Sequence, residues 1–143
     1  MSHKPVLNPK MIGETENSLR ALLNKILIGS GLDFHGWAAL QVVSMSPAPL
    51  IEEQLAAVLQ NSLKIDEPHV LAVIADLRAQ GLIDNAPEAV GLTAQGSELY
   101  SRLNGEVRPK IAEIFEGLDP DDLAAAYRVL AAIMARANAL LAA

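Results

Sequence analysis

Apolar residues recur three and four positions apart along most of the chain, which is the spacing of helices that bury one face. The first such segment begins near Met11, after an arm of residues 1–9 that holds two prolines, and ends at the Gly-Ser-Gly of residues 29–31. The second follows Asp33, a residue type that favours helix N-caps, and ends at the Ser-Pro-Ala-Pro of residues 46–49. We therefore expect two helices in the first third of the chain.

The middle of the chain predicts two shorter helices joined by an irregular link. The first helix covers residues 51–59, and the link covers residues 61–64. The second helix begins after Asp66, has Pro68 in its first turn where proline is tolerated, and ends at Gly81. Its apolar residues at positions i, i+3, i+4 and i+7 form a stripe that we expect to be buried: Val70, Val73, Ile74 and Leu77.

A short β-like section comes next. Two apolar pieces, residues 82–83 and 90–92, flank a polar turn at residues 84–89 that contains one proline. This pattern predicts a short two-stranded wing. Thr93, directly after it, has the residue type of an N-cap and should begin another helix.

Two long helices are expected in the rest of the chain. The first should be broken or kinked near Gly105 and Pro109, because glycine and proline both weaken a helix interior. The second begins at Asp119, which can cap it, with Pro120 at its first position. Its apolar residues alternate spacings of four and three, as in a heptad seam: Leu123, Tyr127, Leu130, Met134, Ala137 and Leu141.

The order of these segments, together with several short motifs, resembles the MarR family of bacterial regulators. The motifs are Gly31-Leu32, the segment 34–40, Glu53-Gln54-Leu55-Ala56, the segment 70–83, and Leu92-Thr93-Ala94-Gln95-Gly96, which is similar to the family's Leu-Thr-x-x-Gly after the wing. The resemblance implies a mainly α fold, a winged helix-turn-helix with a short two-stranded wing and flanking N- and C-terminal dimerisation helices. It covers nearly the whole chain after Pro9.

The resemblance also divides the chain and suggests partners. Residues 1–9 would be an N-terminal arm, residues 10–45 and 97–143 a helical dimerisation region, and residues 46–96 the winged helix-turn-helix domain. The protein would be a homodimer whose second motif helix enters the major groove of DNA. A small apolar or aromatic ligand would bind between the dimerisation helices and the winged domain.

The acidic net charge of the chain argues against strong DNA binding. The net charge is −6, whereas proteins hold DNA mainly through Lys and Arg that neutralise phosphates. Residues 50–96 contain seven acids but only two bases, Lys64 and Arg78, so this segment alone carries a net charge of −5. The wing turn has no base at all and would repel a minor groove.

The residues that could touch DNA are correspondingly few. In the expected link and second motif helix they are Asn61, Ser62, Lys64, His69 and Arg78. The side of the helix opposite its buried stripe is instead apolar. It could meet a protein partner through Leu71, Ala72, Ala75 and Ala79.

A ligand pocket, if the resemblance extends to one, would include Asp33, His35 and Trp37. The alternative is that Asp33 only caps a helix and that Trp37 belongs to the core or the dimer contact. The three histidines do not pair at helical spacing, so no metal site is expected, and the chain has no cysteine. No catalytic constellation or cofactor motif stands out, which predicts a protein that is not an enzyme and needs no cofactor.

Two functions remain open at this point. The protein is either a MarR-like DNA-binding transcriptional regulator that responds to a small ligand, or a divergent winged-helix dimer that no longer binds DNA and serves as a protein- or ligand-binding module. There is no uninterrupted apolar run of eighteen residues and no signal-peptide pattern at the N-terminus, so we expect no membrane contact and a cytoplasmic location.

Overall fold

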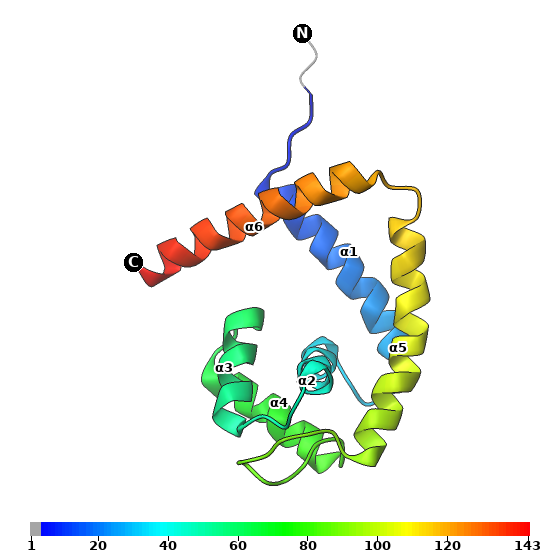
Figure 1. The fold of residues 1–143 in the computed structure, drawn as a ribbon, viewed down its shortest axis with the longest axis vertical. Helices are drawn as coiled ribbons and strands as arrows, with labels where there is room; N and C mark the ends of the chain where they lie inside the picture. Colours follow the sequence, from blue (N-terminus) through cyan, green and yellow to red (C-terminus); the bar gives the residue numbers. More distant parts are fainter. Residues whose placement is uncertain (1–3) are drawn as a thin grey trace. The chain divides into compact units, whose positions relative to one another are not determined.

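The computed structural model describes residues 4–143, and six helices are found in that range (Figure 1). Their bounds are α1 Pro9–Leu27, α2 Phe34–Met45, α3 Glu52–Leu63, α4 Glu67–Ala79, α5 Ala94–Phe115 and α6 Pro120–Ala142. The chain up to Val107 forms one compact unit, and Arg108–Ala143 forms a second. The boundary falls inside α5, between the two positions, Gly105 and Pro109, that weaken a helix interior.

The core of the first unit is built around α2, which is seen end-on in Figure 1. This helix packs against α1, α3 and α4, and α3 also packs against α4. The predicted stripe of α4 is confirmed, since Val70, Ile74 and Leu77 are fully buried and Val73 packs against them. An all-aliphatic stripe of this kind holds α4 by one side and leaves its other side facing outward.

The predicted helix caps are present. The Asp33 carboxylate accepts a hydrogen bond from the Gly36 amide at 2.8 Å, and the Asp66 carboxylate accepts one from the His69 amide at 3.0 Å. Asp119 likewise accepts from the amide of Asp121 at 2.7 Å. Each side chain satisfies a backbone donor that the first turn of a helix cannot pair internally.

The prediction for α3 was wrong at its C-terminal end. The helix runs four residues further than expected, so Asn61 and Ser62 are helical and not part of an irregular link. The helical register explains the extension, because Leu63 lies one turn beyond the buried Leu59 and also packs against the core. Lys64 then stops the helix in a left-handed conformation with φ 55°.

The wing is less regular than expected. Within residues 4–143 no strand forms, and the pairing consists of two isolated antiparallel bridges, Ile83 with Leu92 and Leu50 with Val90. The apolar pieces are only two and three residues long, which leaves no room for a longer ladder. The two-stranded wing is therefore not confirmed as a pair of strands.

The second unit contains the end of α5 and the whole of α6. The helix is not broken at Gly105 or Pro109, since α5 continues across both positions, and a kink there stays a prediction. Helix α6 begins at Pro120, as predicted, and none of its residues is buried. By length and composition alone it is the one helix in the described part of the chain that could span a membrane.

Candidate nucleic-acid interface

Helices α3 and α4 form a compact helix-turn-helix. Only three residues, Lys64, Ile65 and Asp66, separate them. This is the usual length of the turn in DNA-binding motifs of this class. The left-handed Lys64 reverses the chain, and Asp66 starts the second helix by capping it. The turn is shorter than the predicted link of residues 61–64 implied, because that segment is helical as far as Leu63.

The outward side of α4 carries no hydrogen-bonding side chain along its centre. Opposite the buried stripe, five exposed residues line up: Pro68, Leu71, Ala72, Ala75 and Ala79. Leu71 is the largest of them and is 44% exposed. His69 and Asp76, both exposed, lie along one edge of this row. The centre of the outward side of α4 therefore lacks the polar side chains that usually read base edges in the major groove.

The other predicted DNA contacts divide into outward and inward residues. Asn61, Ser62 and Lys64 are all exposed at the C-terminal end of α3. The Lys64 ammonium donates a hydrogen bond to the Asn61 side-chain oxygen at 3.1 Å. These three residues therefore form a small polar group on the surface, next to the first turn of α4.

Arg78, in contrast, points into the protein. Its guanidinium pairs with the Glu52 carboxylate and donates a further hydrogen bond to the Asp84 carbonyl oxygen at 3.1 Å. The side chains of Arg78 and Glu52 are only 20% and 28% exposed. Arg78 thus joins the start of α3 and the wing to α4. Sequence reasoning could not detect this, because Glu52 lies 26 positions away.

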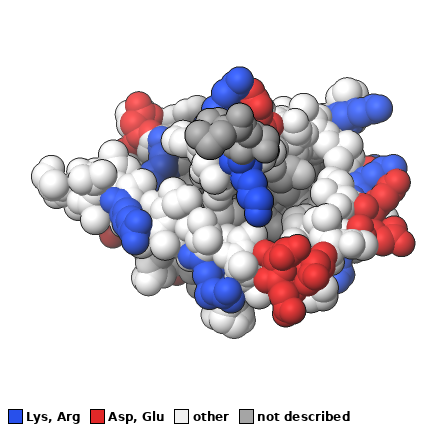
Figure 2. Space-filling view, turned by 90° about the horizontal axis from the view of Figure 1, so that it is seen from above, with Lys and Arg blue, Asp and Glu red and all other residues white. Residues whose placement is uncertain are grey.

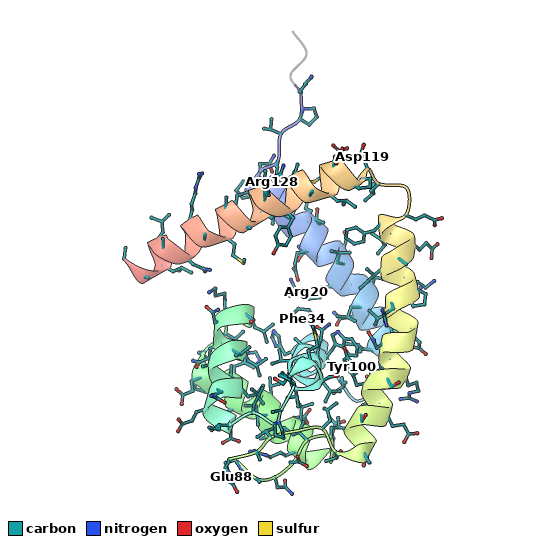
Figure 3. All side chains as sticks on the ribbon, in the orientation of Figure 1. Arg20, Phe34, Glu88, Tyr100, Asp119 and Arg128 are labelled. Carbon is teal, nitrogen blue, oxygen red and sulfur yellow. The ribbon has the colours of Figure 1, made fainter. Side chains whose placement is uncertain are left out.

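The wing loop is fixed at its base and acidic at its tip. The Leu50 amide donates to the Val90 carbonyl at 3.0 Å, and the Glu52 amide donates to the Pro87 carbonyl at 2.7 Å. Glu88 projects from the outer edge of the loop (Figure 3). The loop is therefore attached to the start of α3, and the charge it presents outward is negative.

Acidic side chains outnumber basic ones on the outer surface of this motif. Five carboxylates in residues 50–96 are exposed: Glu53, Asp66, Glu67, Asp76 and Glu88. Lys64 is the one exposed base in the same segment, because Arg78 is partly buried in its ion pair. A different face of the molecule, drawn in Figure 2, is white over much of its area and carries both separate blue Lys and Arg side chains and groups of red Asp and Glu side chains.

The three predicted pocket residues have different environments. Asp33 caps α2, as described above. Trp37 is 4% exposed, and its ring stacks on that of Tyr100 from α5 at a centroid distance of 5.1 Å and an angle of 17°. His35 is half-buried, and its ring meets the His69 ring edge-on at 4.8 Å. One residue of the predicted pocket therefore contacts one residue of the predicted DNA set.

Neighbouring contacts place His35 among aromatic groups. The Phe34 ring lies 5.6 Å from that of His35, and the Arg20 guanidinium of α1 sits 5.5 Å from the Phe34 ring centre (Figure 3). No group of three or more possible metal ligands is found in the part of the chain that the structure describes.

Among the cavities formed by the described residues of the first unit are two open ones, each of about 310 Å³. One lies between the residue that follows α4, Gln80, and α5, and most of its lining is polar, including Gln95 and Arg102. The other lies behind the wing, beside Ser44, Pro49 and neighbouring residues. Neither of these two cavities includes Asp33, His35 or Trp37, so the predicted pocket set does not line them.

Solved structures show what this arrangement is similar to. The reduced form of MarR from E. coli has a TM-score of 0.68 to this chain and 18% sequence identity, covering 91% of this chain and 95% of that one. The chain has the fold of MarR-family regulators. Neither a family model nor a curated protein matches the sequence.

Two further structures with the MarR fold contain ligands. The Mycobacterium tuberculosis MarR family protein Rv2887, solved in complex with DNA, has a TM-score of 0.66 and 21% identity, covering 90% of this chain and 98% of that one. CouR from Rhodococcus jostii RHA1, bound to p-coumaroyl-CoA, has a TM-score of 0.72 and 15% identity, covering 87% and 88%. A transcriptional regulator of the MarR family from Rhodococcus sp. RHA1 also has a TM-score of 0.72, with 15% identity, covering 87% of this chain and 90% of that one.

Proposed function

We propose that this protein is a transcriptional regulator of the MarR type that binds DNA as a homodimer in the cytoplasm. The observation that carries the proposal is the helix-turn-helix itself: α3, a three-residue turn, and α4 held by one side with its other side exposed. It lies within a fold shared with Rv2887, which was solved with DNA. The domain division that fits this function has residues 46–96 as the winged domain and the remaining helices as the dimerisation region.

The exposed face of α6 supports the homodimer. The large residues of its heptad seam lie on one side, where Tyr127 is 76% and Met134 is 62% exposed. Arg128 lies on the opposite side, among alanines, and Arg136 lies at the edge of that side, beside Val129. A helix in lipid would be apolar all round, whereas a helix with one apolar side buries it against another helix. We therefore assign this side to a second copy of the chain and not to a membrane.

DNA contacts would come from few side chains. The outward group of Asn61, Ser62 and Lys64 is placed to approach phosphates beside α4, and His69 lies at the edge of the helix. Lys4 and Lys10, both exposed near the N-terminus, are additional candidates. Arg78 is assigned a positioning role, because its charge is paired with Glu52 inside the motif. Affinity should accordingly be weak and its salt dependence shallow.

For effector binding, His35 is the residue of the predicted pocket set that we assign to ligand contact. Trp37 is buried against Tyr100, and the Asp33 carboxylate already caps α2. His35 contacts His69 of α4, so a small apolar or aromatic ligand that displaced its ring would also disturb the edge of the recognition helix. The solved complex of CouR with p-coumaroyl-CoA, a large charged thioester with an aromatic acyl group, supports only the aromatic part of this assignment.

Fluorescence anisotropy with a 30-base-pair duplex tests the proposal. Binding at low salt that weakens at 0.2 M salt is expected, because phosphate contacts release counterions. Lys64→Ala should weaken this binding. The double variant Ala72→Arg and Ala75→Arg is a positive control, because it adds two cations to the exposed side of α4 and should tighten binding.

No binding by the wild type at low salt, together with binding by the double Arg variant, would overturn the proposal. It would show a correctly exposed motif that lacks DNA affinity of its own. The acidic surface around the apolar side of α4 would then point to a protein partner at Leu71, Ala72, Ala75 and Ala79.

A further inference from the structure

The outward row of α4 has a chemistry that selects among base pairs without hydrogen bonds. Its residues, Pro68, Leu71, Ala72, Ala75 and Ala79, are all exposed and all apolar. In the major groove the one apolar group offered by a base pair is the C5-methyl of thymine, and Ala is among the side chains that contact it. We propose that α4 reads thymine methyl groups, and hence that its target is an A·T-rich stretch of major groove.

This inference rests on the proposed DNA binding and names the class of sequence that the same site would select. The helix-turn-helix and its similarity to a protein solved with DNA define the site. The residue types on α4 define its preference for A·T pairs. The exposed polar residues of α4 nearest the row are Glu67 and His69, on either side of Pro68, and Asp76 further along, so hydrogen bonding to a base is confined to the edges of the row.

The dimensions of the row fit such a contact. From Pro68 to Ala79 the helix rises by about 16 Å. With 3.4 Å between successive bases of a strand, the row would face roughly five base pairs. Three of its five residues are alanines, and their short side chains let the helix backbone come close to the floor of the groove.

The row offers no hydrogen-bond partner to the polar groups of either base pair. A G·C pair and an A·T pair each present three polar groups in the major groove, so the loss of water against Leu71 and the alanines costs binding free energy in both cases. The thymine methyl group is the one feature by which this row can tell the pairs apart, and a G·C pair lacks it.

Replacing thymine by uracil isolates the methyl group, because it leaves charge, pairing and every hydrogen-bonding group unchanged. We compare one A·T-rich 30-base-pair duplex, the same duplex with deoxyuridine for thymidine, and a G·C-rich duplex with cytosine or 5-methylcytosine. Anisotropy is measured with the full chain at one fixed low salt concentration. Each methyl group that α4 buries should contribute about fourfold in affinity.

The thymine duplex should bind most tightly and the G·C duplex weakly. The uracil version should bind about fourfold more weakly than the thymine duplex if the row covers one methyl group, and about fifteenfold more weakly if it covers two. Adding 5-methyl groups to cytosine should restore part of the affinity. Ala75→Ser, which adds a hydroxyl in the row, should reduce the ratio between thymine and uracil duplexes. Ala132→Ser, an exposed alanine of α6, should leave this ratio unchanged.

The possible outcomes separate the two proposals. Equal binding of thymine and uracil duplexes would overturn the methyl readout and leave DNA binding intact. Lys64→Ala should weaken every duplex by the same factor, because a phosphate contact does not depend on the base. Failure to bind any duplex would overturn both proposals and assign the apolar row to contact with a protein.

Discussion

At the scale of single residues, Gly96 fixes how α5 leaves the wing. A Cβ atom added at this position would lie 2.0 Å from the Leu82 carbonyl oxygen. The neighbouring Thr93 caps α5 by accepting a hydrogen bond from the Gly96 amide at 3.0 Å, and its own amide donates to the same Leu82 carbonyl at 3.1 Å. The close approach explains in physical terms why the motif Leu92-Thr93-Ala94-Gln95-Gly96 ends in glycine.

Gly96→Ala should therefore destabilise the protein by about 1–3 kcal/mol, the range for forcing atoms into a packed site. Gly105→Ala in the same helix is the control. A Cβ there would have no neighbour within 4 Å, and the higher helix propensity of Ala should add up to ~1 kcal/mol. Urea unfolding of both variants measures the difference. A similar change in both would show that the contact with Leu82 does not constrain α5.

Arg78 leads to a second prediction at this scale. A double-mutant cycle with Arg78→Met and Glu52→Gln should give a coupling energy of about 1 kcal/mol or more, because the pair is mostly shielded from water. The same cycle on Lys10 and Glu14, whose side chains are 84% and 63% exposed, should give well under ~1 kcal/mol. Equal coupling in the two cycles would contradict the positioning role of Arg78.

At the scale of elements, local chemistry predicted where most helices begin. Asp33, Asp66 and Asp119 cap their helices through side chains only three or fewer residues from the amide they accept, so the sequence contains the whole interaction. The end of α3 was missed because the polar Asn61 and Ser62 concealed the continued spacing from Leu59 to Leu63. Tertiary packing decided that boundary.

Contacts between distant segments could not be predicted in the same way. His35 and His69 are 34 positions apart and meet only because α2 and α4 pack together. The Arg78 and Glu52 pair depends equally on the folding of the motif. The outward apolar row of α4, in contrast, follows from helical spacing alone, and all of its residues are exposed as expected. Periodicity predicts faces, whereas it does not predict which faces touch.

The turn of the helix-turn-helix allows a test that separates stability from DNA binding. Lys64 has φ 55°, a conformation that costs an L-residue with a side chain roughly 1 kcal/mol or more and costs glycine little. Lys64→Gly should therefore raise the melting temperature of the isolated protein. It should also weaken duplex binding, because the exposed ammonium is lost. A variant that lost both stability and affinity would argue that Lys64 contributes to the fold through its hydrogen bond to Asn61.

At the scale of the whole molecule, the charge distribution limits how this protein can use DNA. With a net charge of −6 and one exposed base in residues 50–96, the general attraction to phosphates is small. Two motifs held about 34 Å apart in a dimer would engage successive turns of the major groove and add their weak contacts. For the proposed DNA binding, dimerisation would therefore matter more in this protein than in a basic regulator.

The side chains of α6 provide the test of that requirement. Leu130 belongs to the apolar side and is 43% exposed, while Ala132 lies on the side with Arg128 and Arg136. Leu130→Glu should place an unpaired charge in the dimer contact and raise the dimer dissociation constant at least a hundredfold, whereas Ala132→Glu should leave it unchanged. Sedimentation velocity over a concentration series measures both dissociation constants.

If the dimer forms through α6, Leu130→Glu should also lose duplex binding in parallel with dimerisation, although no residue of the motif is altered. A wild-type monomer that binds duplex DNA, or a Leu130→Glu dimer as stable as the wild type, would remove α6 from the assembly and require another explanation for its exposed apolar side.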